Sequence, residues 1–403
     1  MDLLEIIFWG MALLIFYTYI GYGIILYISV AIKEWFVKRV EIRKDESSSI
    51  IEHNLPAVTL LVAAYNEEEV AEEKILNSLD LDYLDDKLHL IWVTDGSTDK
   101  TNDIISRYPK VILLHQNIRE GKSAAINRAI PFVKTPIVVF SDANAMLNKD
   151  AIRIIANAFS DSKVGCVAGE KRVVYGDKDG ASSSGEGIYW RYESKLKELD
   201  SRLYSAVGAA GELYAIRTNL YNNVEKSVLL DDFILSMRIA MKGYRIRYCR
   251  DAYAVEFGAK NMKEEEKRKV RISAGGLQSV IMLTPLLNIF KYGFFSFQYV
   301  SHRLLRWTIT PIALFALMPL NIALALRNAG NIYSVLLIFH ALFYFLSIAG
   351  YLMAEREVKR KIIFVPYYFM FMNLSVLKGF RYLYKKRGTG VWEKSERAKK
   401  QQL

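Results

Sequence analysis

Three apolar stretches early in the chain each end abruptly in a cluster of acidic, amide and hydroxyl side chains. The stretches cover residues 58–64, 88–94 and 136–141, and the polar clusters begin at Tyr65, Asp95 and Asp142. Such β-branched runs are typical of parallel strands in an open α/β sheet, where ligands bind at the carboxyl ends of the strands. Because these clusters are mostly acidic, the pattern predicts a site for a metal-bound, phosphorylated ligand.

Asp142 and Asn144 are the candidates for holding the metal ion. Residues two apart on an extended segment share one side, so both oxygens can reach one ion. Hard cations such as Mg²⁺ or Mn²⁺ prefer oxygen ligands and generally bind through one or two carboxylates together with substrate phosphates. The alternative is an exposed turn in which these side chains bond only to nearby backbone.

The other clusters offer groups that could hold a nucleotide. Tyr65, Asn66 and Glu67 supply an aromatic face and polar groups, although the same residues could cap a helix. Asp95 lies in a Thr-Asp-Gly-Ser segment that also has the composition of a turn. Lys122 follows a glycine at a predicted helix start, where backbone amides and an ammonium group can hold an anion. The segment is not a P-loop, because the upstream glycine is missing.

Two adjacent carboxylates, Asp231 and Asp232, begin a predicted amphipathic helix that ends at Gly243. Capping and the helix dipole explain one acidic group at this position well. Two acidic groups after an apolar pair are better explained by a proton donor or acceptor at the mouth of a site.

The elements that must position these residues alternate between strand and helix patterns from residue 56 to about residue 260, as in βαβ units. A helical pattern at residues 186–203 is amphipathic and is predicted to lie near the membrane. Cys166 and Cys249 are the two cysteines of the sequence and both fall in this domain. We therefore expect neither a disulfide framework nor a cysteine metal cluster.

An apolar segment precedes this domain. Of the 403 residues 52% are hydrophobic, which is high for a purely soluble protein. Residues 6–30 are long enough to cross a bilayer, which needs about 20 residues. Acidic residues precede this segment and basic residues follow it, so the positive-inside rule places the N-terminus outside and the domain in the cytoplasm. The absence of a basic leader and of a small-residue cleavage site favours an anchor over a cleaved signal peptide.

Three further apolar segments follow the domain, at residues 307–326, 332–353 and 362–383. The first two are joined by a short loop and predict a hairpin. If the third also crossed the membrane, the basic tail 381–400 would lie outside, whereas its charge predicts a position inside. The third segment is therefore re-entrant or interfacial, or the spans are miscounted. Basic flanks near anionic lipid account for the net charge of +11 without a nucleic acid partner.

Taken together and in this order, the clusters resemble the family 2 glycosyltransferases of the GT-A fold. They are most similar to the membrane-embedded branch that includes cellulose, chitin, hyaluronan and poly-N-acetylglucosamine synthases. The resemblance covers nearly the whole chain, from the tyrosine-rich segment 16–22 to the tail segment 392–397. It implies an α/β protein: a Rossmann-like mixed-sheet domain inserted between N-terminal and C-terminal transmembrane helices, with interfacial helices.

On this basis the chain divides into six parts. They are an N-terminal transmembrane anchor (1–33), a linker (34–55), a cytoplasmic GT-A catalytic domain (56–260), interfacial amphipathic helices (261–305), C-terminal transmembrane or re-entrant segments (306–384) and a basic tail (385–403).

The resemblance also implies a role for each cluster. Asp142 and Asn144 occupy the family's site for Mg²⁺ or Mn²⁺, and the amide in place of a second carboxylate should weaken the hold on the metal. Asp232, in its pair with Asp231, corresponds to the general base. The residues implied to bind the UDP-sugar donor are Ala64, Tyr65, Asn66, Glu67, Asp95, Lys122 and Asp142.

One motif departs from the family pattern. Processive members carry Gln-x-x-Arg-Trp after the base, and the matching stretch here runs from Arg268 to Ile272. Arg271 is retained, and with Arg268 it is a candidate for binding the diphosphate or the acceptor, but the glutamine and the tryptophan are absent. The alternative for both arginines is a basic face on a juxtamembrane helix. Glu212 resembles part of the family's acceptor-side strand, or it forms a structural ion pair.

Three functions remain open at this point. The first is an inverting, metal-dependent synthase that builds a β-linked polysaccharide from UDP-sugar at the cytoplasmic membrane, with export as a coupled step. The second is the transfer of one or a few sugars to a lipid-linked acceptor, which the missing glutamine and tryptophan favour. The third is a catalytically silent nucleotide-binding subunit of an export complex. The sequence does not specify the sugar, the acceptor or any accessory subunit.

Overall fold

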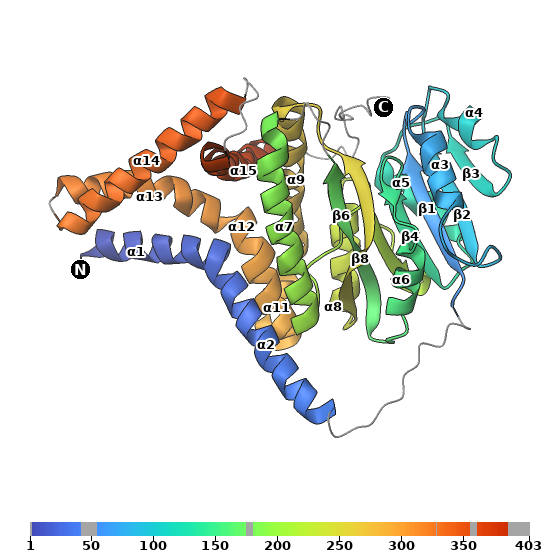
Figure 1. Ribbon diagram of the computed structural model, residues 1–403, viewed down its shortest axis with the longest axis horizontal. Helices are drawn as coiled ribbons and strands as arrows, with labels where there is room; N and C mark the ends of the chain where they lie inside the picture. The colour runs from blue at the N-terminus through green and yellow to red at the C-terminus, as the bar shows by residue number, and fades with distance from the viewer. Residues whose placement is uncertain (1, 42–54, 175–179, 328, 355–360, 386–403) are drawn as a thin grey trace.

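A sheet domain lies beside a group of long helices in the computed structural model (Figure 1). The structure describes residues 2–41, 55–174, 180–327, 329–354 and 361–385. The predicted linker falls largely, and the basic tail beyond residue 385 wholly, outside these described residues.

The domain is built on one eight-stranded mixed sheet with the order β3-β2-β1-β4-β7-β6-β8-β5. The strands are β1 (Val58–Ala64), β2 (Leu88–Asp95), β3 (Val111–Gln116), β4 (Ile137–Asp142), β5 (Met146–Leu147), β6 (Val164–Val174), β7 (Leu213–Arg217) and β8 (Arg245–Phe257). The first four strands of that order are parallel. β7 is antiparallel to both of its neighbours, and β6 and β8 are parallel to each other. The three sequence runs are thus confirmed as neighbouring parallel strands whose carboxyl ends meet at one edge.

Burial on both faces of the sheet explains why these strands read as continuous apolar runs. In β4, Val138 and Phe140 belong to one hydrophobic cluster, whereas Ile137 and Val139 belong to the cluster on the opposite face. The helices connecting the strands supply the remaining apolar side chains. They are α3 (Ala71–Leu79), α4 (Thr101–Ile105), α5 (Lys122–Ala129), α6 (Ala151–Ala158) and α8 (Asp231–Met241).

The second part of the molecule consists of helices, several of them long, from both ends of the chain and from its middle. They are α1 (Leu3–Phe16), α2 (Tyr22–Glu41), α7 (Gly180–Leu203), α9 (Met262–Met282), α10 (Ile289–Tyr292), α11 (Phe294–Tyr299), α12 (Leu305–Trp307), α13 (Ile309–Leu326), α14 (Asn331–Ala354) and α15 (Lys361–Lys385). A π-helical turn, Tyr17–Gly21, separates α1 from α2, which continues to Glu41. The predicted amphipathic helix is part of α7 and packs on α2 through Leu196 and Leu199.

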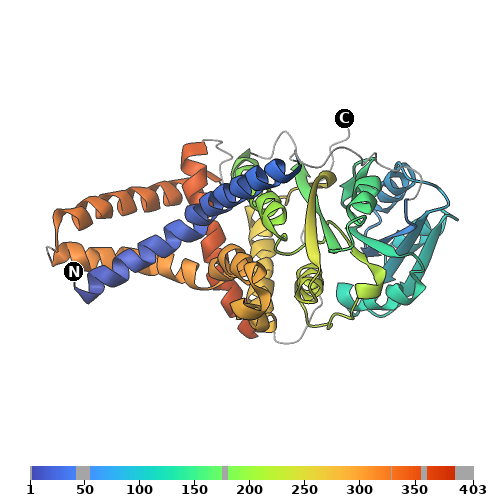
Figure 2. The same cartoon turned by 90° about the horizontal axis from the view of Figure 1, so that it is seen from below.

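Four segments of the described chain are long and apolar enough to cross a membrane. They are Leu3–Val37, Ile309–Leu326, Asn331–Met353 and Ile362–Lys385. In both views α1, α13 and α14 extend away from the sheet domain, whereas α15 crosses their direction between them and the helices α7 and α9 (Figures 1 and 2).

Candidate active site

A cavity of about 900 Å³ lies where the carboxyl ends of β1, β2 and β4 face the long helices. Tyr65, Asp95 and Asp142 line the end next to the sheet. Tyr19 and Phe369, from the apolar helices, line the opposite end. The cavity therefore connects the predicted donor site with the candidate membrane segments.

The two carboxylates of α8 lie between these ends. Asp231 and Asp232 occupy the first turn of α8, and both line the cavity. The backbone N–H of Phe233 donates to Oδ1 of Asp232 at 2.8 Å. Burial, followed by the adjacent charge of Asp231, raises the pKa of Asp232 to about 7, while the Lys122 ammonium opposes this rise. A carboxylate with a pKa near neutrality is well suited to accept a proton from a hydroxyl group.

Gly211 lets two functional side chains approach the same point of the backbone. A Cβ atom at this position would lie 3.0 Å from Nζ of Lys122 and 3.2 Å from Oδ2 of Asp232. Any larger residue would therefore press on both groups. The presence of a glycine before Glu212 thus has a steric explanation, which the sequence pattern alone did not show.

Lys122 and Asp142 form an ion pair at the sheet end of the cavity, with 2.6 Å between Nζ and Oδ1. Burial acts to lower the pKa of Lys122, but the carboxylates of Asp142, Asp231 and Asp232 outweigh it and raise that pKa. Lys122 therefore keeps its positive charge at the sheet end of the cavity.

The oxygen atoms of Asp142 and Asn144 fit a divalent ion that arrives with its substrate. Both residues line the cavity. The described residues contain no cluster of three or more His, Cys, Asp or Glu side chains that could hold a metal by themselves. Mg²⁺ and Mn²⁺ commonly bind through one or two carboxylates and complete their coordination with substrate phosphates. Asp142 and Asn144 would form an incomplete ligand set of that kind.

A buried lysine that the sequence analysis missed, Lys74, bonds to residues on both sides of Asp142 and Asn144. Lys74 donates to Oγ of Ser141 at 2.9 Å and also to the carbonyl of Ala145. Burial lowers its pKa to about 7, although Asp142 acts in the opposite direction. Its spacing from Ala71 and Ser78 places it in the buried stripe of α3, a helical pattern visible in the sequence.

The predicted nucleotide residues divide into those that line the cavity and those that shape it. Ala64, Tyr65 and Glu67 line it, and Arg119, which the sequence analysis missed, places its guanidinium 3.7 Å from the centre of the Tyr65 ring. Asp95 also lines the cavity.

Asp95 and Asn66 both organise loops at this end. Asp95 accepts hydrogen bonds from the backbone N–H groups of Glu120 and Gly121, the latter at 2.6 Å, and so fixes the turn before Lys122. Asn66 does not line the cavity; its Oδ1 accepts from the N–H of Thr98 at 2.8 Å, and its φ of 51° is left-handed. Its observed contacts are therefore with the neighbouring loop.

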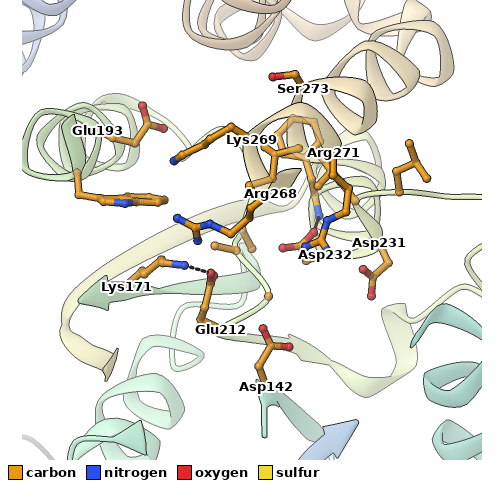
Figure 3. A pocket seen from close by; sticks show the side chains of 18 of the residues that line it. Asp142, Lys171, Glu193, Glu212, Asp231, Asp232, Arg268, Lys269, Arg271 and Ser273 are labelled. Atoms are coloured by element: carbon orange, nitrogen blue, oxygen red, sulfur yellow. Dashed lines mark hydrogen bonds and ion pairs between the residues drawn. The ribbon is translucent and has the colours of Figure 1, made fainter. Parts of the chain in front are cut away.

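Two of the predicted acceptor-side residues, Glu212 and Arg268, form ion pairs, and Figure 3 shows that of Glu212 with Lys171. Lys171 pairs with Glu212 and with Glu256. Arg268 contacts Glu265 at 3.0 Å and Glu256 at 3.6 Å. Although burial opposes it, Lys171 holds the pKa of Glu212 below its ordinary value. Glu212 thus forms the ion pair proposed as its alternative role, and it also lines the cavity.

Arg268 and Arg271, both from α9, line the cavity as well. Two tryptophans that the sequence analysis did not place in the site also contribute. Trp190 lines the cavity from α7, and Trp307 lines it from α12. The ring of Trp307 lies 5.1 Å from that of Phe233, and a Cβ at Gly276 would lie 2.5 Å from Trp307. The second glycine of α9 therefore makes room for this indole beside the turn that carries Asp232.

A family model described as "Glycosyltransferase like family 2" matches residues 56–275, which include every acidic cluster described above. This chain belongs to family 2 of the glycosyltransferases. The family and the expected mixed α/β fold are thereby confirmed.

Two curated relatives match this family 2 glycosyltransferase over similar lengths. The present chain is 25% identical over 253 residues to the poly-beta-1,6-N-acetyl-D-glucosamine synthase of Staphylococcus aureus (strain COL), and the alignment covers 60% of each protein. It is 26% identical over 250 residues to the probable glycosyltransferase YdaM of Bacillus subtilis (strain 168), covering 59% of each. The chain thus spans about 60% of the length of these relatives in the alignments.

A solved structure shows that the likeness in fold extends over almost the whole glycosyltransferase. It is the mannosyltransferase PcManGT from Pyrobaculum calidifontis in complex with GDP-Man and Mn²⁺, with a TM-score of 0.65 at 22% sequence identity. The match covers 96% of this chain and 100% of the other. The helices outside the sheet domain are therefore part of the shared fold.

Proposed function

We propose that this protein is an inverting, metal-dependent glycosyltransferase that builds a β-linked glycan from a UDP-sugar at the cytoplasmic face of the membrane. The observation that carries the proposal is the position of Asp232. Its carboxylate lies in the same cavity as Lys122 and Asp142, close to the backbone of Gly211. A proton acceptor and the groups suited to a nucleotide diphosphate thus face one space.

The reaction follows from the ordinary weakness of a hydroxyl nucleophile. Asp232 accepts the hydroxyl proton as the acceptor oxygen forms a bond to the anomeric carbon. The bond from that carbon to the diphosphate breaks, and UDP leaves with the electron pair. Attack on one face and departure from the other invert the anomeric centre, so an α-linked donor gives a β-linked product.

The charges around the cavity match the needs of the leaving group. Asp142 and Asn144 would hold Mn²⁺ or Mg²⁺, which offsets the diphosphate charge when it is bound. Lys122 supplies a permanent positive charge beside Asp142. Arg268 and Arg271 extend the cationic lining on the α9 side.

The choice of a β-linked polysaccharide product is supported by the name of the Staphylococcus aureus relative, which is a poly-beta-1,6-N-acetyl-D-glucosamine synthase. The proposed topology places the N-terminus outside and the sheet domain in the cytoplasm, in keeping with basic residues after the first apolar segment.

The test is release of UDP by purified protein with Mn²⁺ or Mg²⁺. UDP-N-acetylglucosamine, UDP-glucose and UDP-galactose are offered in turn, with GDP-mannose as the alternative nucleotide. We expect metal-dependent release from one UDP-sugar and a loss of at least about 100-fold in Asp232→Asn, the usual contribution of a general base. Asp251→Asn is the matched control, because Asp251 is exposed and does not line the cavity.

Two results would contradict the proposal. Full turnover by Asp232→Asn would exclude Asp232 as the base. Tight UDP binding without turnover of any donor, also in the presence of a membrane extract, would favour the silent binding subunit.

A further inference from the structure

The helix α3 packs against the loop 142–147, which follows β4 and carries Asp142 and Asn144. Ile75 of α3 and Ala145 of the loop belong to one hydrophobic cluster. Lys74 lies beside Ile75, and it is 0% exposed. Lysine is rarely buried to this extent, because taking its amino group out of water is costly unless it is well hydrogen-bonded. A residue that served packing alone would be apolar at this position.

Lys74 bonds to both ends of the turn that presents the candidate metal ligands. Its Nζ donates to Oγ of Ser141 at 2.9 Å and to the carbonyl of Ala145. The backbone N–H of Ala145 in turn donates to the carbonyl of Asp142 at 3.1 Å, which closes the turn. The side chain of Lys74 thus fixes the backbone on either side of Asp142 and Asn144.

Asn77, one turn further along α3, binds the next part of the loop. Its Nδ2 donates to the carbonyl of Leu147 at 2.9 Å, and its Oδ1 accepts from the N–H of Leu147 at 2.8 Å. Residues three apart in a helix are neighbours on one face, so Lys74 and Asn77 reach the loop from the same side. The helix therefore holds this segment at Ser141, Ala145 and Leu147.

Ser141 extends the connection to the predicted acceptor side of the cavity. It accepts from Lys74, and its own hydroxyl donates to the carbonyl of Glu212 at 3.0 Å. Glu212 follows Gly211, where a Cβ would lie 3.2 Å from Oδ2 of Asp232. Consecutive hydrogen bonds thus run from Lys74 through Ser141 to the turn beside Asp232.

We propose that Lys74 is a positioning residue for glycosyl transfer, because it fixes the loop with the metal ligands relative to the turn beside Asp232. Lys74 does not line the cavity, so it acts through Ser141 and Ala145 and not by contact with the substrate. A displacement of about 1 Å between reacting groups can cost about 100-fold in rate, which is why such a connection matters. The inference rests on the proposed function and adds a residue to its machinery.

The first test needs no ligand. Lys74→Met keeps an unbranched side chain of similar size and removes the donor, which leaves the buried carbonyl of Ala145 without this partner. We expect the amides of the loop 142–147 to exchange their hydrogens about tenfold faster, measured by mass spectrometry on the whole protein. Lys149→Met is the matched control: Lys149 joins the same loop region to Asp80 at 3.7 Å but is 65% exposed. Unchanged exchange in Lys74→Met would overturn the proposal.

The second test is the affinity for Mn²⁺ at saturating UDP, measured from the paramagnetic resonance signal of free Mn²⁺. Lys74→Met should raise the apparent dissociation constant about tenfold, because the loop no longer holds both oxygen ligands in place. UDP binding without metal should change less than twofold. An unchanged Mn²⁺ affinity, or an equal loss of UDP binding without metal, would refute a positioning role, since the latter shows only general damage to the fold.

The third test uses a smaller change, which also decides the case in which Lys74→Met does not fold. Ser141→Ala breaks the connection to Glu212 and keeps the bond from Lys74 to Ala145. We expect kcat for UDP release to fall about tenfold while KM for the donor stays within twofold. Ser78→Ala is the control, because this hydroxyl is equally buried but donates only to the carbonyl of Lys74 within α3, at 2.7 Å. A normal kcat in Ser141→Ala would contradict the inference.

The proposed function can fail separately from this inference. Absence of UDP release by the unaltered protein with every donor would refute the transfer reaction. The hydrogen-exchange comparison would still decide whether Lys74 holds the loop, because it requires neither donor nor turnover. Normal turnover by the unaltered protein, with unchanged exchange and Mn²⁺ affinity in Lys74→Met, would refute the role of Lys74 alone.

Discussion

Replacing Asp231 by asparagine should extend the activity of the enzyme to lower pH. Burial and the charge of Asp231 raise the pKa of Asp232 to about 7, and only the ionised carboxylate can accept a proton. In the unaltered protein kcat/KM should therefore rise with pH and level off above about pH 7. Asp231→Asn removes the like charge, which lowers the pKa of Asp232 and moves this rise toward acid.

The size of the shift follows from Coulomb's law. Two carboxylates roughly 6 Å apart at an effective dielectric constant of about 20 repel each other by about 3 kcal/mol, which corresponds to about two pKa units. Solvent in the open cavity screens part of this repulsion, so we expect a shift of about one unit. Burial remains after the substitution, and the pKa should stay above that of an exposed aspartate.

The assay is UDP release at low donor concentration between about pH 5 and pH 9, because kcat/KM reports the ionisation of the free enzyme. Asp251→Asn, which removes an exposed carboxylate, should leave the profile unchanged. A profile that rises near pH 4 in the unaltered protein, or one that does not move in Asp231→Asn, would refute the assignment of Asp232 as a base tuned by burial and by its neighbour.

Three further substitutions test other parts of the site. Asn144→Asp supplies a second carboxylate and should lower the Mn²⁺ concentration for half-maximal activity several-fold, measured by metal titration; an unchanged requirement would place the metal elsewhere. Gly211→Ala adds a methyl group 3.2 Å from Oδ2 of Asp232, so kcat should fall about tenfold at an unchanged melting temperature; normal kcat would argue against this crowding. Gly208→Ala should cost about 1–3 kcal/mol of stability, because its φ is +88° and the new Cβ would lie 2.2 Å from the Phe233 ring; calorimetry without a lower melting temperature would contradict this.

The sequence was sufficient to predict the parallel half of the sheet because its strands are buried on both faces. Alternate residues of β4 enter opposite hydrophobic clusters, so the four successive positions 137–140 are apolar and the run stands out. The pairing of β6 with both β7 and β8 could not be predicted in the same way, since it joins distant segments. The packing of α15 along α9, seen in the ion pair of Lys378 with Glu266, joins segments far apart in the sequence and was likewise beyond sequence reasoning.

In the site, too, residues with a recognisable local sequence pattern could be predicted, whereas residues brought there by the fold could not. Asp142, Asn144, Asp231 and Asp232 could be singled out because each pair lies at a strand end or a helix start with a recognisable spacing, and all four line the cavity. Lys197 had no such signal: α7 brings it to the cavity wall, and its sequence context is that of one more charged residue on an amphipathic helix.

The most direct test of the central claim is the anomeric configuration of the product. The purified protein is supplied with an α-linked UDP-sugar, Mn²⁺ and an acceptor from a membrane extract, and the new linkage is examined by proton NMR before any secondary reaction. A single displacement with Asp232 as base predicts a β-linked product and no product from Asp232→Asn. An α-linked product, or a normal amount of product from Asp232→Asn, would contradict the account.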